Sequence, residues 1–151
     1  MTPRGIVLDA NVIIRGVLGT RVAALLLAHA GRVTLFVPDT ACEEARRHLP
    51  DILGRRGQSL AGVQAASETL EALILGLRVV PAASYESQKR AALARIGDRD
   101  PDDWPVLACA LLTGCPIWTE DQDFFGAGVA TWSTALVELY FNETDSDLPE
   151  Q

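Results

Sequence analysis

Short apolar segments alternate with longer amphipathic segments along most of the chain. The short segments have the length and apolar content of buried β-strands, at residues 5–8, 33–37, 78–80, 115–119 and 129–132. Between them, apolar residues recur at helical spacing over residues 21–30, 40–49, 59–75, 84–96, 103–113 and 134–141. Strands that alternate with helices form a parallel sheet covered on both faces. The pattern therefore predicts an α/β fold in which a parallel β-sheet is sandwiched between α-helices.

Proline and glycine residues set several predicted boundaries. Pro50 lacks a backbone N–H, so we expect it to end the helix that begins after Pro38, with a loop over residues 53–57. Pro105 fits only the first turn of a helix, which predicts Asp102 as the N-cap and Asp103 as the first helical residue. After Asn11, an apolar stretch leads into a glycine-rich turn.

Length and composition indicate one domain without membrane segments. The 151 residues suffice for a single core, and we assign residues 1–141 to the domain. The segment 142–151 is acidic and lacks apolar periodicity, so we expect a disordered tail. No apolar run reaches transmembrane length, and the N-terminus lacks the features of a signal peptide. Three cysteines without metal-ligand spacing favour a reduced, cytoplasmic location.

Acidic residues follow the predicted strands. Asp9 comes directly after residues 5–8, and Asp121 follows residues 115–119. Glu44 and Asp103 lie at the starts of helices that leave the same edge of the sheet, beyond which ligands bind in such folds. Helical phase places Glu44 at the border of the buried stripe, whereas Glu43 points away from it.

Taken singly, each of these acids is explained by helix capping or turn formation. Taken together, they would repel one another at short range, because no matching set of basic residues accompanies them. A hard divalent cation relieves this repulsion, and Mg²⁺ or Mn²⁺ prefers carboxylate oxygens and water. The acidic set therefore predicts a metal site.

The charge distribution bears on partners. A net charge of −7 argues against a protein that holds nucleic acid by bulk electrostatics. Four arginines nevertheless follow the predicted arm over residues 40–75 and form either a solvated surface or a docking surface: Arg46, Arg47, Arg55 and Arg56. The apolar face of the second arm helix predicts a homodimer unless it packs in the core; its leucines are Leu60, Leu70, Leu73 and Leu77.

Two other classes of α/β domain fit the sequence less well. A phospho-acceptor receiver needs a lysine just after a late strand, but the only lysine, Lys89, falls within a helical pattern. A nucleotide-binding domain needs a glycine-rich phosphate loop, and neither GxGxxG nor GxxxxGK[ST] is present.

Four segments resemble, in order, the acidic motifs of PIN-domain nucleases, which include the VapC toxins of bacterial toxin–antitoxin pairs. They are LDANVII (8–14), EEARRHL (43–49), DPDDWPVLACAL (100–111) and IWTEDQDFF (117–125). The resemblance implies metal binding by Asp9, Glu44, Asp103 and Asp121, with Asp123 as an accessory ligand. It also implies that Asn11 and Thr119 orient these carboxylates, while Asp100 and Asp102 are loop and capping residues.

The resemblance further implies an activity, namely metal-dependent endonucleolytic hydrolysis of RNA with Mg²⁺ or Mn²⁺. A VapC-type toxin would have a cognate antitoxin protein as its partner. The alternative is a catalytically silent binding or signalling domain with the same fold.

Overall fold

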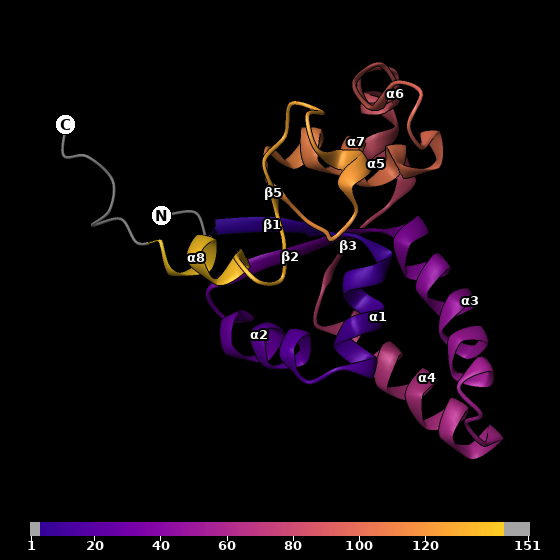
Figure 1. Ribbon diagram of the computed structural model, residues 1–151. Helices are drawn as coiled ribbons and strands as arrows, with labels where there is room; N and C mark the ends of the chain where they lie inside the picture. The colour runs from indigo at the N-terminus through magenta and orange to yellow at the C-terminus, as the bar shows by residue number, and fades with distance from the viewer. Residues whose placement is uncertain (1–3, 144–151) are drawn as a thin grey trace.

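The computed structural model describes residues 4–143 and contains one five-stranded sheet (Figure 1). The strand order is β3-β2-β1-β4-β5, and every neighbouring pair is parallel. The strands are β1 (Arg4–Leu8), β2 (Val33–Pro38), β3 (Arg78–Val80), β4 (Ile117–Trp118) and β5 (Thr131–Trp132). The predicted parallel sheet is thereby confirmed, although its last two strands are shorter than the apolar segments suggest.

Helices cover both faces of the sheet and create two cores (Figure 1). One core contains residues of α1 (Ala10–Leu18), α2 (Arg21–His29), α3 (Asp39–Arg55), α4 (Leu60–Leu75) and α8 (Val137–Asn142). The other contains residues of α5 (Ala82–Tyr85), α6 (Lys89–Ile96) and α7 (Trp104–Thr113). Three short 3₁₀ helices complete the list: η1 (Glu86–Gln88), η2 (Pro101–Asp103) and η3 (Gln122–Phe124).

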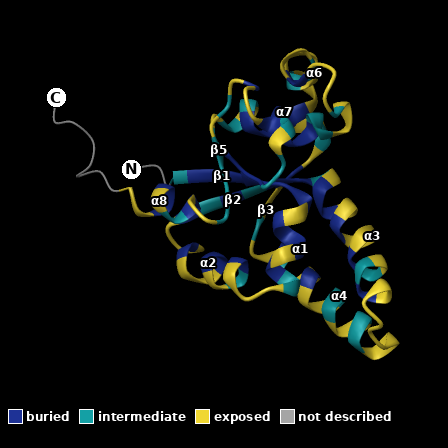
Figure 2. Ribbon diagram, viewed as in Figure 1, coloured by how far each residue is buried: buried dark blue, intermediate teal, exposed yellow. Residues whose placement is uncertain are grey.

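The central strand β1 is buried on both faces, as Figure 2 shows. Ile6 and Leu8 pack in the first core, and Val7 packs in the second. This division follows from the alternation of side chains along a strand. A strand buried on both sides needs a continuous aliphatic run, and GIVL supplies it.

The order of the strands changes direction between β1 and β4. The chain passes from β1 to β2 and β3 in one direction, then crosses back to β4 and β5 on the other side of β1. Leu8 of β1 is in register with Trp118 of β4. Such a switch in direction is where α/β sheets bind ligands, beyond the carboxyl ends of the strands. Asp9 and Thr119 are the first residues beyond these two ends.

Several predicted helix boundaries are wrong. α3 continues through Pro50 to Arg55, because Leu49 and Leu53 both pack in the core on either side of the proline. Burial of a leucine side chain contributes roughly 1.5–3 kcal/mol, which is comparable with the cost of an internal proline. The expected turn after Asn11 is instead the amphipathic helix α1, and the expected helix over 84–96 is divided into α5, η1 and α6.

The long helices α3 and α4 form the predicted arm, but the apolar face of α4 belongs mostly to the core. Leu70 is 1% exposed, and Leu73 and Leu77 pack against the first core, whereas Leu60 is 90% exposed. Most of the face on which the homodimer prediction depended is therefore covered within the domain, and Leu60 is the exception.

Within residues 4–143, no single helix is long and apolar enough to cross a membrane. The consecutive helices α1 and α2 would qualify together, but they are bent by 104° and both contribute to the core. Of the predicted tail, Asn142 is the last residue of α8 and Glu143 pairs with Arg4 at 2.8 Å. The rest of the tail lies outside the described residues.

Candidate metal centre

Asp9 is held in one orientation at the end of β1. Its Oδ1 accepts a hydrogen bond of 3.0 Å from the backbone N–H of Val12, which caps α1, and its Oδ2 accepts one from the hydroxyl of Thr119. Burial raises the pKa of Asp9 to about 6, although these two hydrogen bonds lower it; the charges of Asp121 and Glu44 raise it further. Asp9 thus serves as a helix cap and also faces other acids.

Thr119 links the two acids that follow β1 and β4. It is fully buried, donates to Asp9, and accepts a 2.9 Å hydrogen bond from the backbone N–H of Asp121. Asp121 Oδ1 in turn accepts a 2.9 Å bond from the backbone N–H of Asp123, and so starts η3. A single threonine therefore fixes the spacing of Asp9 and Asp121, in the orienting position expected from the sequence.

The turn before α7 differs from the prediction. Asp100, and not Asp102, provides the cap, because its Oδ1 accepts a 3.0 Å bond from the backbone N–H of Asp102 and starts η2. α7 then begins at Trp104, so Asp103 occupies the N-cap position and is not the first helical residue. The side chain of Asp103 makes no capping hydrogen bond.

Asp103 carries the least satisfied polar atom of the site. Its Oδ2 is buried and has no hydrogen-bond partner among residues 4–143. Burial is the main reason that the pKa of Asp103 rises to about 8, and the charges of Asp100, Asp121 and Asp9 add to the effect. A hydrogen bond between the carboxyl groups of Asp103 and Asp121 forms only when one of them is protonated, and it raises this pKa further.

Asp100 is a member of the acidic cluster that the sequence did not single out. Carboxylate oxygens of Asp100, Asp103 and Asp123 all lie within 4.8 Å of one another. The signal that could have identified Asp100 is its distance of three residues from Asp103, since residues i and i+3 align in a 3₁₀ helix. The predicted ligands Asp9, Glu44 and Asp121 are not among these three acids, but Asp9 and Asp121 lie near enough for their charges to raise the pKa of Asp103, and the charges of Asp121 and Glu44 raise that of Asp9.

Glu44 approaches the cluster from α3. It lines a pocket of about 340 Å³ together with Asp100, Asp102 and Asp103, whereas Glu43 is not among the lining residues. Both glutamates are exposed, so the degree of burial does not distinguish them. What differs is the side of α3 on which each lies, and helical phase predicts that Glu44 is on the side of the site. Asn11 is exposed, and its side chain forms no hydrogen bond with these acids in the described part of the chain.

The residues of the cluster fit a hard divalent cation. All candidate donors are carboxylate oxygens, which Mg²⁺ and Mn²⁺ prefer. The partnerless oxygen of Asp103 lacks a positive or donor group, and the pKa values of Asp9 and Asp103 are raised by burial and neighbouring negative charge. A bound cation would offset the negative charge of Asp9 and Asp103 and would give the Asp103 oxygen a positive partner.

A model of the PIN domain family matches residues 7–142. The chain belongs to the PIN domain family. Every acid of the site in this PIN domain lies within the matched region, since the first is Asp9 and the last is Asp123. No sequence of a curated protein matches the chain.

Solved structures share the fold of this PIN domain at low sequence identity. PAE2754 from Pyrobaculum aerophilum is 16% identical, with a TM-score of 0.68 over 92% of this chain and 89% of that chain. DNA-bound VapBC from Salmonella typhimurium is 20% identical, with a TM-score of 0.63 over 88% of this chain and 99% of that chain. A toxin–antitoxin complex from Klebsiella pneumoniae is 16% identical, with a TM-score of 0.59 over 85% of this chain and 97% of that chain.

Proposed function

We propose that this PIN domain is a metal-dependent endoribonuclease that hydrolyses phosphodiester bonds in single-stranded RNA. The observation that carries the proposal is the buried, partnerless oxygen of Asp103 in a cluster of carboxylates at the switch point of the sheet. PIN domains are typically metal-dependent nucleases, and this chain has an acid in each of the four motif segments.

The residues that would hold Mg²⁺ or Mn²⁺ are Asp9, Glu44, Asp103 and Asp121, with Asp123 as an accessory ligand. The structure adds Asp100, whose carboxylate lies with those of Asp103 and Asp123. When bound, such an ion supplies a water of lowered pKa and stabilises the negative charge that develops on phosphate.

The contributions of the protein itself follow from its hydrogen bonds. Thr119 and the N–H of Val12 fix the Asp9 carboxylate, so little reorganisation is needed when a ligand binds. Asp103 holds a proton near neutral pH and would release it as a cation enters, because metal ligands must be deprotonated. The acidic site thus combines one carboxylate that is held by hydrogen bonds with one that exchanges a proton.

The net charge of −7 predicts weak non-specific binding of RNA. Recognition would then depend on the metal and on local positive side chains more than on a broad basic surface. The RNA sequence that is cut is not specified by any group in the pocket.

We further propose that the nuclease acts as the toxin of a type II toxin–antitoxin pair, with a cognate antitoxin as its partner. The support is the resemblance to VapC toxins together with the shared fold of a toxin–antitoxin complex and of VapBC. Co-expression with the product of the neighbouring reading frame tests this part, since an antitoxin would co-purify with the protein and inhibit cleavage.

The nuclease proposal is tested with a matched pair of glutamates. Wild type should cut an unstructured RNA oligonucleotide with Mg²⁺ or Mn²⁺ and lose this activity in EDTA. Glu44→Gln should lower the rate by about 100-fold or more, since loss of a ligand costs more than loss of an outer partner. Glu43→Gln removes the same charge one residue away and should retain the rate within a few-fold.

Cleavage that persists in EDTA, or equal rates for the two variants, would contradict the assignment. A well-folded wild type that binds RNA but does not cut it with either metal would favour the alternative, a catalytically silent binding domain.

A further inference from the structure

Arg46 and Arg47 are consecutive residues of α3 with different surroundings. Arg46 donates from Nε and Nη2 to the carboxylate of Glu71 on α4, at 2.9–3.0 Å. Arg47 forms no ion pair or side-chain hydrogen bond with any residue between 4 and 143. It lines the same pocket as Glu44. The bidentate pair therefore holds Arg46 against α4. Arg47 has no such pair among the described residues, and it lines the pocket.

The pocket has a strong imbalance of charge. Its lining includes the acids Glu44, Asp100, Asp102 and Asp103, and Arg47 is the single basic residue among them. An approaching phosphodiester would be repelled by these carboxylates unless positive groups lie on its path. A guanidinium that is not ion-paired can donate two parallel hydrogen bonds to a phosphate, a geometry that lysine cannot supply.

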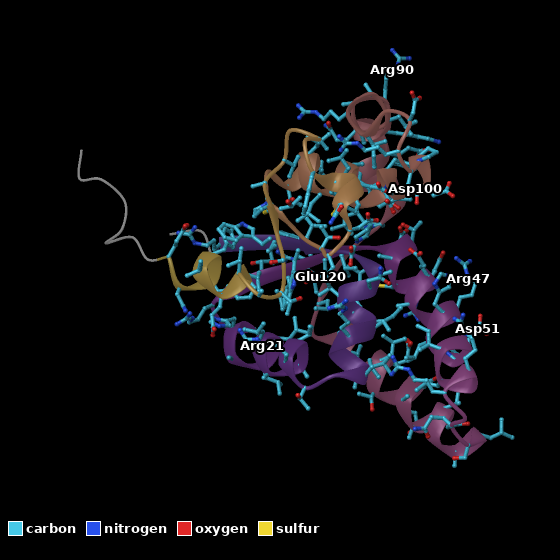
Figure 3. All side chains as sticks on the ribbon, in the orientation of Figure 1. Arg21, Arg47, Asp51, Arg90, Asp100 and Glu120 are labelled. Carbon is cyan, nitrogen blue, oxygen red and sulfur yellow. The ribbon has the colours of Figure 1, made fainter. Side chains whose placement is uncertain are left out.

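The position of Arg47 suits a phosphate next to the reacting one. Arg47 follows Glu44 by three residues and so lies on the same flank of α3, one turn farther along the helix. Figure 3 shows Arg47 and Asp100 on the same side of the molecule. An RNA strand with one phosphate at the acidic cluster would therefore bring a neighbouring phosphate toward this turn.

We propose that Arg47 binds a backbone phosphate of single-stranded RNA beside the bond that is cut, an inference that rests on the proposed nuclease function. Arg47 is then a substrate-binding residue, and Arg46 has no part in binding. Of the four arginines on the predicted arm, Arg47 is the one that lines the pocket beside the acids.

Arg47→Ala and Arg46→Ala form a matched pair, because each removes one positive charge from the same turn of α3. Initial rates of cleavage of an unstructured RNA oligonucleotide give KM and kcat for both. Arg47→Ala should raise KM about tenfold with kcat within a few-fold, in line with the loss of a charged hydrogen bond. Arg46→Ala should leave both constants within about twofold, since its ion pair with Glu71 lies at the surface.

Salt dependence gives a readout that a purely structural role would not change. Each phosphate contact to a single strand contributes about 0.7 to the slope of log affinity against log salt concentration. Arg47→Ala should lower the magnitude of this slope by about 0.7, Arg46→Ala should leave it unchanged, and Arg47→Lys should restore the slope but only part of the affinity.

Binding of the same RNA, labelled with fluorescein and measured by anisotropy with Ca²⁺ in place of Mg²⁺, separates the two proposals. If wild type does not cut but Arg47→Ala still weakens binding, the nuclease function fails and the Arg47 contact stands. If wild type cuts and the two alanine variants behave alike in KM and salt slope, the Arg47 contact is overturned and the nuclease function stands. A wild type that neither cuts nor binds would overturn both.

Discussion

Asp9 and Asp103 belong to the same acidic site but are held in opposite ways. Both oxygens of Asp9 accept hydrogen bonds, from Val12 and Thr119, whereas Asp103 has a buried oxygen without a partner in the described chain. Asp9 is also the more buried of the two, yet its pKa rises only to about 6, against about 8 for Asp103. Burial raises both pKa values, but two donors lower that of Asp9, whereas neighbouring carboxylates raise that of Asp103 further.

The difference has a structural origin. Asp9 follows a strand whose neighbours are fixed by register, so Thr119 of the adjacent chain segment meets it directly. Asp103 ends a short 3₁₀ turn that is capped by Asp100, and its buried Oδ2 has no hydrogen-bond partner among the described residues. The carboxylate of Asp9 is therefore held by hydrogen bonds within the fold, whereas Oδ2 of Asp103 is not.

The largest expected effects come from replacing Asp9 or Asp103 with alanine. Both variants should lose activity, but only one should lose stability. Asp9→Ala should lower the rate of RNA cleavage about 1,000-fold, because several kcal/mol of charge stabilisation are lost. It should also lower the free energy of unfolding by about 0.5–2 kcal/mol through loss of the α1 cap. Asp103→Ala should lower the rate similarly without lowering the stability of the metal-free protein. Cleavage assays and urea unfolding in EDTA provide both quantities, and a destabilised Asp103→Ala would remove the distinction.

A smaller effect is expected from the link between Asp9 and Asp121. Thr119→Val keeps the shape of the side chain but leaves Asp9 Oδ2 and the N–H of Asp121 without their partner. We expect a loss of about 1–3 kcal/mol in stability and a 10–100-fold decrease in metal affinity or rate. Thr119→Ser retains the hydroxyl and serves as the control. Equal losses in the two variants would show that the methyl packing of Thr119 matters as much as its hydrogen bonds, which would contradict the assigned linking role.

The smallest effect is a pH dependence of the metal-free protein. The pKa of Asp103 is raised from 3.8 to about 8 on folding, so the folded state binds its proton more tightly than the unfolded state. Stability from this group is therefore greatest at low pH and is lost as the pH rises toward 8. Between pH 6 and pH 8.5 in EDTA, the melting temperature of wild type should fall by about 3–6 °C more than that of Asp103→Asn. Parallel curves for the two proteins would mean that Asp103 does not titrate in this range and would contradict the raised pKa.

Much of this arrangement could be predicted from the sequence because it depends on local patterns. Asp9 and Asp121 are recognisable because each follows a short apolar strand, and Glu44 is distinguished from Glu43 by helical phase alone. The parallel sheet follows from the alternation of strands and helices, and the structure confirms it.

The remaining features depend on residues that are distant in sequence or on the type of a single turn. α3 passes Pro50 because Leu53 packs in a core shared with α4, which no local signal reports. Arg46, and not Arg47, forms the ion pair with Glu71, which lies 25 residues farther along the chain. Asp100 joins the acidic cluster because the turn after it is a 3₁₀ helix, and an α-helical start at Asp102 would have pointed it elsewhere.

The central claim, that Asp103 is a metal ligand left without a partner by the fold, is tested most directly by thermal melts with EDTA and with Mg²⁺. At roughly 10 to 100 times its dissociation constant, Mg²⁺ should stabilise wild type by about 1.4–2.7 kcal/mol, a rise of roughly 3–10 °C in melting temperature. Asp103→Asn should melt above wild type without metal and lose most of the rise. Asp102→Asn, which removes the same charge from an exposed neighbour, should keep it. If Asp103→Asn melts below metal-free wild type and retains the full rise, Asp103 is a structural residue of the turn and the account is wrong.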